Sequence, residues 1–245
     1  MKLFLHLGRY FLMIQKTFGK FTKWKMLKNL IFREIDDLII SSIGIVSFLS
    51  FFVGGVVAIQ TAINIDNPLL PTYLIGFTTR QSMILEFSPT FISVIMAGKV
   101  GSYITSSIGT MRVTEQIDAL EVMGVNTYNY LIFPKIIALT LFPFLITISM
   151  ALGIFGGYIA SINGGFASHS DFIEGLQLDF IPFHIFYAFI KTFIFAILLA
   201  TIPSYHGYFM KGGALGVGKA STTSFIWTSV AIIIANSLIT NLLLT

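Results

Sequence analysis

The 245-residue sequence contains no cysteine and few charged residues. The absence of Cys excludes disulfides, thiolate metal sites and a cysteine nucleophile. Only 11% of the residues are Asp, Glu, Lys or Arg, about half the fraction found in soluble domains. Hydrophobic residues make up 55% of the chain, and the mean hydropathy is +0.85. These values indicate an integral membrane protein, and one compact bundle accounts for the length.

The few basic residues are concentrated near the start of the chain. Residues 1–37 hold eight of the fifteen Lys and Arg residues, and the net charge is +4. A basic segment next to apolar runs favours contact with an anionic membrane surface over nucleic-acid binding.

This N-terminal segment also predicts an amphipathic helix. Apolar residues recur at helical spacing: Leu3, Leu7, Phe11, Ile14, Phe18 and Phe21. Basic residues fall on the opposite side: Lys2, Arg9, Lys16, Lys20 and Lys23. We interpret residues 1–37 as an interfacial region that lies in the membrane plane, with Trp24 as a further anchor. The alternative is an ordinary helix packed on a soluble core.

Five apolar stretches are long enough to cross a bilayer, which needs about 20 residues. They are Leu38–Ile59, Tyr73–Ala97 with a possible extension to Ser107, Leu131–Ala160, Phe183–Pro203 and Ser224–Leu244. We therefore expect an all-α membrane protein with a five-helix bundle over residues 38–245, within one domain of residues 1–245.

The loop charges predict the orientation of these spans. The N-terminal segment and the 98–135 and 204–222 connections are basic, whereas the 60–72 loop carries only Asp66 and the 161–182 loop is acidic. The positive-inside rule then places the N-terminus in the cytoplasm and the C-terminus outside.

Three ionisable residues fall inside predicted spans: Arg80, Glu86 and Lys191. Span two also carries a polar stripe, which consists of Thr79, Ser82, Glu86, Thr90 and Ser93. Pro89 lies within the stripe and predicts a kink. We expect Thr79, Arg80, Ser82, Glu86 and Lys191 to contribute polar contacts to a substrate cavity. The alternative is a structural ion pair of Glu86 with Lys191 or Arg80 that locks the bundle.

Between spans two and three lies a polar island, residues 109–125, with the sequence GTMRVTEQIDALEVMGV. Thr110 or Thr114 can cap a short helix, and Gly124 suits its end. Spacing places Glu115, Asp118 and Glu121 on one acidic ridge, with Arg112 able to pair with Glu115. A second, apolar stripe consists of Val113, Ile117 and Leu120. A helix with both stripes can dock into a groove on a partner, and a solvated loop helix is the alternative.

Other motifs favour neither a nucleotide site nor an enzyme. Residues 213–219 resemble a phosphate-binding loop, but Ala220 stands where the motif needs Ser or Thr. We interpret this segment as a flexible cytoplasmic connection. The four His residues show no metal-ligand spacing, so we expect no catalytic residue and no metal site. The GxxxG pattern of Gly153–Gly157 permits packing within one chain or between copies.

The island, followed by Tyr130-Leu131-Ile132-Phe133-Pro134, strongly resembles the MlaE/YrbE permease family. These proteins are membrane subunits of Mce-associated ABC lipid transporters. Support comes from residues 97–101 (AGKVG), Gly156-Gly157 and residues 216–223 (GVGKASTT). The resemblance extends over essentially the whole chain.

The resemblance implies partners that the residues alone do not. It implies a homodimer in a bacterial inner membrane, a cytoplasmic ABC ATPase and a periplasmic MCE-domain protein that exchanges phospholipid with the permease. The segment Thr114–Gly124 would be the coupling helix. Its ATPase-coupling residues would be Arg112, Glu115, Gln116, Asp118, Leu120 and Glu121. ATP and Mg²⁺ would be bound by the ATPase, and this chain would hold no cofactor.

The function expected on this basis is phospholipid transport that maintains outer-membrane asymmetry. The main alternative is an ion-coupled secondary transporter or channel that uses Glu86, although no internal repeat is visible. A membrane-embedded lipid-modifying enzyme and a scaffold that merely recruits a partner are further alternatives.

Overall fold

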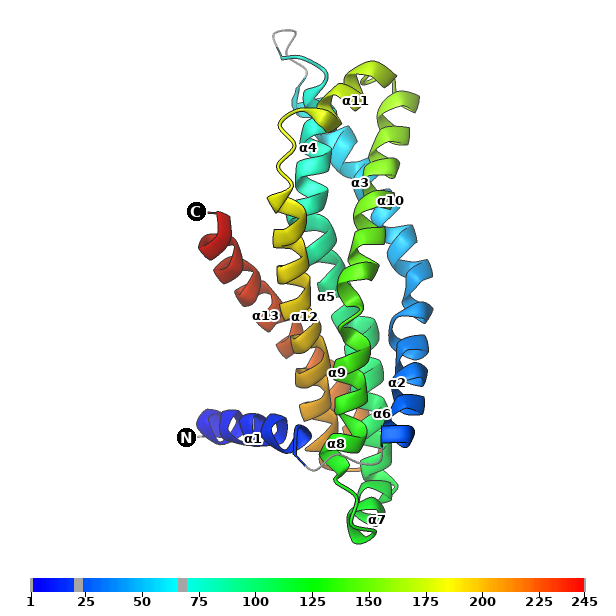
Figure 1. Ribbon diagram of the computed structural model, residues 1–245, viewed down its shortest axis with the longest axis vertical. Helices are drawn as coiled ribbons and strands as arrows, with labels where there is room; N and C mark the ends of the chain where they lie inside the picture. The colour runs from blue at the N-terminus through cyan, green and yellow to red at the C-terminus, as the bar shows by residue number, and fades with distance from the viewer. Residues whose placement is uncertain (1, 20–23, 66–69, 245) are drawn as a thin grey trace. The chain divides into compact units, whose positions relative to one another are not determined.

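The computed structural model describes residues 2–19, 24–65 and 70–244, and this part of the chain contains helices and no strand (Figure 1). The elements are α1 (Lys2–Thr17), α2 (Trp24–Leu38), the 3-10 turn η1 (Ile40–Ser42), α3 (Ile43–Asn64), α4 (Leu74–Ser82), the π-helix η2 (Met83–Phe91), α5 (Ile92–Met96), the π-helix η3 (Ala97–Gly101), α6 (Ser102–Val113), α7 (Gln116–Val122), α8 (Thr127–Leu131), α9 (Phe133–Leu139), α10 (Phe142–Asn163), α11 (His169–Gln177), α12 (Phe183–Tyr208) and α13 (Ala214–Leu244).

Five helical stretches within the described ranges are long and apolar enough to cross a membrane. They are Met26–Asn64, Leu74–Val113, Thr127–Asn163, Phe183–Tyr208 and Ala214–Leu243. The predicted all-α fold with five spans is therefore confirmed, and the chain is a multi-pass membrane protein. All five stretches exceed the roughly 20 residues that a bilayer requires, so the helices continue beyond the apolar segments that the sequence marks.

The first helix covers only part of the predicted interfacial region of residues 1–37. Helix α1 ends at Thr17, where the Gly19 amide donates to the Lys16 carbonyl at 3.2 Å. Helix α2 then begins at Trp24 and leads into the first span. The predicted positions Lys20, Phe21, Lys23 and Asp66, and the side chains of Lys2, Leu3 and Trp24, lie outside the described residues.

The segment 213–219 is not the flexible connection that we expected, because α13 begins at Ala214. The Gly216 amide donates to the Gly213 carbonyl at 2.8 Å and starts the helix. A Cβ at Gly216 would lie 2.5 Å from the Lys211 carbonyl, so this glycine allows a close backbone approach that offsets its low helix propensity.

Contacts between Cα atoms divide the chain into two compact units. Unit 1 comprises Met1–Ser41, Val94–Phe142 and Ile194–Leu238, and unit 2 comprises Ser42–Ser93, Pro143–Phe193 and Ile239–Thr245. The prediction of a single domain over residues 1–245 stays a prediction.

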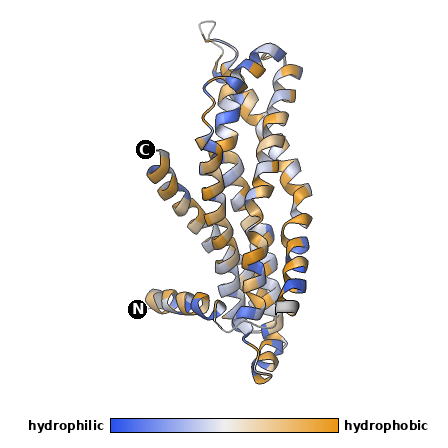
Figure 2. Ribbon diagram, in the orientation of Figure 1, coloured by the Kyte–Doolittle hydropathy of each residue, from blue (hydrophilic) through white to orange (hydrophobic). Residues whose placement is uncertain are grey.

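In unit 1, α1 runs across the direction of α2, α6 and α9 (Figure 1). Hydrophobic and hydrophilic residues both occur along it (Figure 2). Its exposed large apolar side chains are Phe4, Leu5, Leu7, Phe11 and Leu12, and Phe18 directly after its end is exposed as well. The side that faces protein is held by two hydrogen bonds of 2.7 Å, one between His6 Nδ1 and Tyr205 Oη and one between the hydroxyls of Tyr10 and Thr201. Burial raises the pKa of the Tyr10 hydroxyl, so it stays protonated at neutral pH. An apolar face left open is the arrangement that an interfacial helix needs.

The basic residues predicted for the 98–135 connection are partly internal to unit 1. Lys135 lies in α9, is 3% exposed and forms an ion pair with Glu34 of α2. Lys99 donates to the Ser41 carbonyl at 2.5 Å, and the Tyr103 hydroxyl donates to Asp37 at 2.9 Å. Lys135 is therefore a buried structural charge rather than a loop charge.

Unit 2 is built on close contacts between α3 and α10. A Cβ at Gly54 would lie 1.8 Å from the Gly153 carbonyl oxygen, and a Cβ at Gly156 would lie 2.0 Å from the Phe51 carbonyl oxygen. Only glycine permits backbones to approach this closely. The GxxxG pattern is thus engaged in packing within the chain, which was one of its two predicted uses.

The predicted acidic 161–182 loop contains helix α11. Ser168 caps it by accepting from the Asp171 amide at 3.2 Å. The Thr72 hydroxyl donates to the Asp171 carboxylate at 2.7 Å. Hydrogen bonds from Thr72 and Ser168 lower the pKa of this carboxyl, so Asp171 is ionised at neutral pH and joins the two connections of unit 2.

Replacing Gly54 by Ala is expected to destabilise unit 2, because the new methyl group has no room against the α10 backbone. Overpacking of this kind costs about 1–3 kcal/mol. The measurement is the thermal unfolding midpoint of the detergent-purified protein. Gly44→Ala on the same helix is the matched control, since a Cβ there meets nothing within 4 Å. Equal midpoints for the two variants would contradict the close-packing argument.

Candidate functional site

The segment that carries Glu86 is a π-helix. Residues Met83–Phe91 form η2, with Pro89 inside it. Proline has no amide hydrogen, so the α-helical bond at this point is missing, and the wider turn replaces the simple kink that the sequence predicted. Turns of this type occur mostly as short segments and frequently at functional sites. Thr90 donates its hydroxyl to Glu86 Oε2 at 3.1 Å.

Lys191 of α12 is fully buried and points at this segment. Its ammonium donates to Glu86 Oε1 at 2.9 Å, to the Leu85 carbonyl at 2.9 Å and to the Tyr187 hydroxyl at 3.0 Å. Three acceptors match the three hydrogens that an ammonium carries. The hydroxyl of Thr240 in α13 also donates to Glu86 Oε1 at 3.3 Å and shares a 2.8 Å hydrogen bond with Tyr187. We call Glu86, Lys191, Tyr187 and Thr240 the span charge network.

The two charges of this network differ in exposure. The Lys191 side chain is 0% exposed, whereas 42% of the Glu86 side chain is exposed. Removing the partner of a buried charge is strongly destabilising, so Glu86 is required to hold Lys191. The exposed part of the Glu86 side chain can still meet a ligand.

Arg80 does not join this network. It is buried, and its guanidinium donates to the carbonyls of Leu176 at 2.7 Å and Asp179 at 3.3 Å. The rings of Phe77 and Phe180 lie 5.2 and 5.6 Å from its guanidinium carbon, within cation–π range. Arg80 therefore binds the end of α11 to α4 within unit 2.

The other two predicted cavity residues occupy separate surroundings. Thr79 is buried, and its hydroxyl donates to the Ile75 carbonyl at 2.7 Å. Its methyl group faces α10, since a Cβ on Gly157 would lie 2.6 Å from it. Ser82 is half-buried. The structure thus brings together Glu86 and Lys191 and leaves Thr79, Arg80 and Ser82 apart from them.

The polar island folds as a short helix held between turns. α7 covers Gln116–Val122, and the exposed Gln116 begins it. The predicted stop at Gly124 is present: Gly124 has φ +75°, its amide donates to the Glu121 carbonyl, and the Val125 amide donates to the Leu120 carbonyl. This pattern is a Schellman ending. The predicted Thr caps are absent, because the Thr114 hydroxyl donates backward to the Thr110 carbonyl at 2.9 Å.

The acidic ridge of α7 is divided among three environments. Arg112 pairs with Asp118 at 2.5 Å, so the predicted pairing with Glu115 is wrong. Glu115 has φ +58°, and this left-handed turn carries it away from the i,i+3 position that a continuous helix would give. Glu121 Oε1 accepts from the hydroxyls of Thr127 at 3.2 Å and Tyr208 at 2.9 Å.

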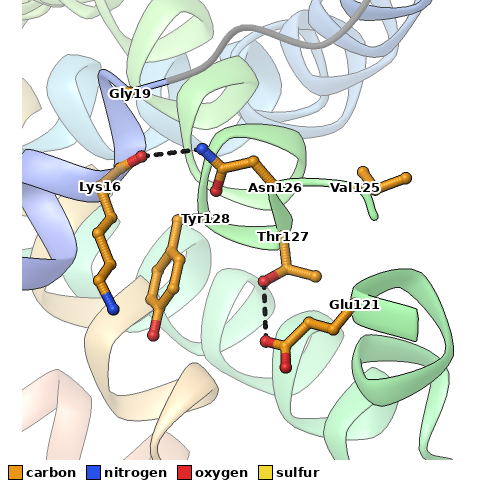
Figure 3. Close-up of a pocket in the computed structure, with 7 residues that line it drawn as sticks. All are labelled: Lys16, Gly19, Glu121, Val125, Asn126, Thr127 and Tyr128. Atoms are coloured by element: carbon orange, nitrogen blue, oxygen red, sulfur yellow. Dashed lines mark hydrogen bonds between the residues drawn. The ribbon is translucent and has the colours of Figure 1, made fainter. Parts of the chain in front are cut away.

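These contacts border a cavity of about 440 Å³ at the base of α7, lined by Lys16, Gly19, Glu121, Val125, Asn126, Thr127 and Tyr128. Figure 3 shows Glu121 bonded to Thr127 and Asn126 bonded to the Lys16 carbonyl on the opposite side. The Tyr208 ring stacks on Tyr128 with 4.4 Å between centroids. The end of α7 is therefore fixed to α8 and α12, and α8 to α1.

The apolar stripe predicted for docking is partly internal. Ile117 is 0% exposed and belongs to the core of unit 1, and Leu120 is half-buried. Val113 is exposed at 37%, and the most exposed apolar side chains of the island are Val122, at 90%, and Met123, at 67%. The left-handed turn at Glu115 rotates α7 relative to a continuous helix, so Ile117 and Leu120 do not continue the exposed face of Val113.

Sequence reasoning also missed Tyr187, Thr240, Thr127 and Tyr208. Tyr187 lies one helical turn before Lys191, and this i,i+4 spacing was a usable signal. Thr240 and Tyr208 come from distant segments, and Thr127 lies six residues after Glu121, so no helical spacing rule connects them to the predicted residues. Among the described residues, no group of three His, Asp or Glu side chains is arranged to hold a metal ion.

Comparison with known proteins adds to this geometry. The family model described as Permease MlaE matches residues 31–242. A probable ABC transporter permease protein of Rickettsia bellii is 32% identical over 215 residues, which cover 87% of this chain and 83% of that protein. A probable ABC transporter permease protein of Synechocystis is 34% identical over 67% of this chain and 63% of its own length.

A more distant relative is a chloroplast protein. The protein TRIGALACTOSYLDIACYLGLYCEROL 1 of Arabidopsis thaliana is 30% identical over 210 residues, which cover 80% of this chain and 56% of that protein.

Replacing Glu86 by Ala is expected to destabilise the protein by about 3–5 kcal/mol, because it leaves the Lys191 charge buried without its carboxylate. Adding Lys191→Met to Glu86→Ala removes that charge and should restore most of the thermal unfolding midpoint in detergent. Ser82→Ala in the same span is the control. A Glu86→Ala variant as stable as the parent would refute the structural role of the pair.

Proposed function

The chain belongs to the MlaE permease family, and on that premise we propose that it is the membrane subunit of an ATP-driven lipid transporter. It would move phospholipid or related hydrophobic molecules between a bacterial inner membrane and a periplasmic MCE-domain protein, and so maintain outer-membrane lipid asymmetry. Two copies would form the permease. ATP hydrolysis, with Mg²⁺, would take place in a separate cytoplasmic ABC ATPase.

The observation that carries this proposal is the position of α7. It is a short helix between the second and third spans, with Val122 and Met123 exposed at its end. Exposed apolar side chains beside charged residues suit a helix that docks into a groove on a partner. The relatives named as ABC transporter permeases support an ATPase as that partner. We propose Arg112, Glu115, Gln116, Asp118, Leu120 and Glu121 as coupling residues, to which Val122 and Met123 are added.

The orientation follows from the same proposal. If α7 meets a cytoplasmic ATPase, the N-terminus lies in the cytoplasm and, after five spans, the C-terminus lies in the periplasm. The basic N-terminal segment agrees with this direction.

A lipid substrate is supported by two observations. The name of the Arabidopsis relative includes that of a galactolipid, trigalactosyldiacylglycerol. In this chain, the partly exposed Glu86 side chain lies within an apolar span, and a polar side chain beside apolar surface suits an amphipathic molecule. Among the five residues first predicted, Glu86 is therefore the proposed contact with substrate, and Lys191 positions it.

The ion-coupled alternative requires Glu86 to bind and release a cation. The Glu86 carboxylate already has a cation beside it, because the fully buried Lys191 ammonium lies 2.9 Å from its Oε1. A second cation at the same carboxylate would be repelled at short range, so the span charge network favours the ATP-driven proposal.

Coupling would pass through Glu121. Its carboxylate accepts a hydrogen bond from Tyr208, the last residue of α12, and α12 is also the helix that carries Lys191. A displacement of α7 by the ATPase would thus reach the end of that helix through a charge-assisted hydrogen bond.

Replacing both exposed residues of α7, Val122→Asp with Met123→Asp, is expected to abolish association with the ATPase, because two charges cannot enter an apolar groove without partners. The tagged chain is purified gently from its native membrane, and mass spectrometry quantifies the proteins and lipids that copurify. The parent should bring down an ATPase, an MCE-domain protein and phospholipid in fixed ratio.

Leu215→Asp is the matched control, since Leu215 is 87% exposed and lies outside the island; it should retain the ATPase. If the parent chain emerges alone, even with candidate partners overproduced, the transporter proposal fails and the ion-coupled reading replaces it.

Tyr208→Phe is expected to lower lipid transport by about tenfold while ATPase association persists. The substitution removes the hydrogen bonds to Glu121 and Thr127 but keeps the ring that stacks on Tyr128. Hydrogen bonds to charged groups contribute about 1.5–3 kcal/mol. The assay compares lipid transfer and ATP hydrolysis in the reconstituted complex. Tyr130→Phe removes a hydroxyl outside this network, and an equal loss in both variants would exclude the proposed route.

A further inference from the structure

A second cavity in unit 1, of about 470 Å³, lies beside α1. Its walls come from α1, from the end of α12 and from the first turns of α13. The polar or charged lining residues used here are His6, Arg9, Tyr205, His206, Lys211 and Lys219. None of these belongs to the span charge network or to α7.

The charge of this cavity is entirely of one sign. Arg9, Lys211 and Lys219 are exposed at its rim, and its lining contains no Asp or Glu. Within the described part of the chain, none of these three cations forms an ion pair. Three cations that converge on one hollow without a carboxylate attract an anion from solution or from the membrane.

The backbone adds to this field. α13 starts at Ala214, and the start of a helix carries a partial positive charge from its unpaired amides. The Lys211 carbonyl approaches Gly216 so closely that a Cβ there would lie 2.5 Å from it. This approach holds Lys211 beside the first turn of α13, where Gly216 and Lys219 line the cavity.

The position of the cavity relative to the bilayer follows from α1. Leu7 and Phe11 of this helix are exposed, and on an interfacial helix such side chains enter the hydrocarbon while the polar side stays among the headgroups. Arg9 lies on the polar side. The wall residues Phe209 and Met210 supply apolar surface next to the cations. A ligand with a phosphate and an apolar part fits both features.

We propose that this cavity binds the phosphate of an anionic phospholipid headgroup from the leaflet in which α1 lies. Arg9, Lys211 and Lys219 hold the phosphate, while the lipid remains part of the surrounding bilayer. The bound lipid connects α1 to the α12–α13 turn. This site is distinct from the proposed transport route and does not depend on it.

The test measures lipid binding to the purified full-length chain by native mass spectrometry. The protein is titrated with phosphatidylglycerol or with zwitterionic phosphatidylcholine. Phosphatidylglycerol should bind about tenfold more tightly. The double variant Lys211→Gln with Lys219→Gln should weaken its binding by roughly 25-fold, since each basic residue at an anionic membrane surface contributes about fivefold.

The matched control is Lys28→Gln with Arg33→Gln. It removes the same charge from exposed positions on α2 that do not line the cavity, and it should change binding by less than about twofold. Arg9→Gln tests the opposite wall independently and should cost about fivefold. Equal losses in the cavity and control variants, or equal binding of the two lipids by the parent, would overturn the proposal.

Competition with inorganic phosphate distinguishes a lipid headgroup from a soluble phosphate as the ligand of this cavity. At millimolar concentration it should leave phosphatidylglycerol bound, because the lipid also gains apolar contacts. Displacement of the lipid by inorganic phosphate in the parent, lost in the Lys211→Gln and Lys219→Gln variant, would assign the cavity to a soluble phosphate and overturn the lipid assignment.

Discussion

The buried ammonium of Lys191 determines much of the arrangement of unit 2. Hydrocarbon offers no hydrogen-bond partner, so a charged group buried in a span needs partners inside the protein. Lys191 finds three acceptors, from Leu85, Glu86 and Tyr187, and Thr240 closes the network from the last helix. Since an unpaired charge there costs several kcal/mol, the elements that supply these groups must stay together whenever the protein is folded.

The same constraint explains the other buried cations and separates structural charges from functional ones. Arg80 is satisfied by the carbonyls at the end of α11, and Lys135 by Glu34 within unit 1. Each cation is nearly inaccessible. Glu86 differs because 42% of its side chain stays exposed although it is ion-paired. A side chain that an ion pair positions and that stays partly exposed can contact a ligand without losing the bond that places it.

Most of the fold was predictable from the sequence, because lipid imposes long apolar runs and loop charges mark their ends. The close α3–α10 contact also had a signal, in the glycines at 54 and 153. The surroundings of the predicted site residues had no signal beyond the i,i+4 spacing of Tyr187 and Lys191. Thr79 lies on the predicted polar stripe, yet its hydroxyl returns to the Ile75 carbonyl and its methyl group meets α10. Helical spacing says which side chains share a face, but contacts from distant segments such as Thr240 decide what that face meets.

The polar island is a second case in which helical spacing did not predict the contacts of the side chains. Those contacts also show how a short helix between two spans is held in place. A continuous helix would have set Glu115, Asp118 and Glu121 on one ridge. The left-handed turn at Glu115 instead directs Asp118 to Arg112 and Glu121 to Thr127 and Tyr208. Carboxylates engaged in this way hold α7 in place. The most exposed apolar side chains of the island, Val122 and Met123, lie at the end of α7, where we propose that the partner docks. Because Asp118 and Glu121 hold the helix to the rest of unit 1, a force applied at its exposed end would be transmitted to α8 and α12 instead of bending a loop.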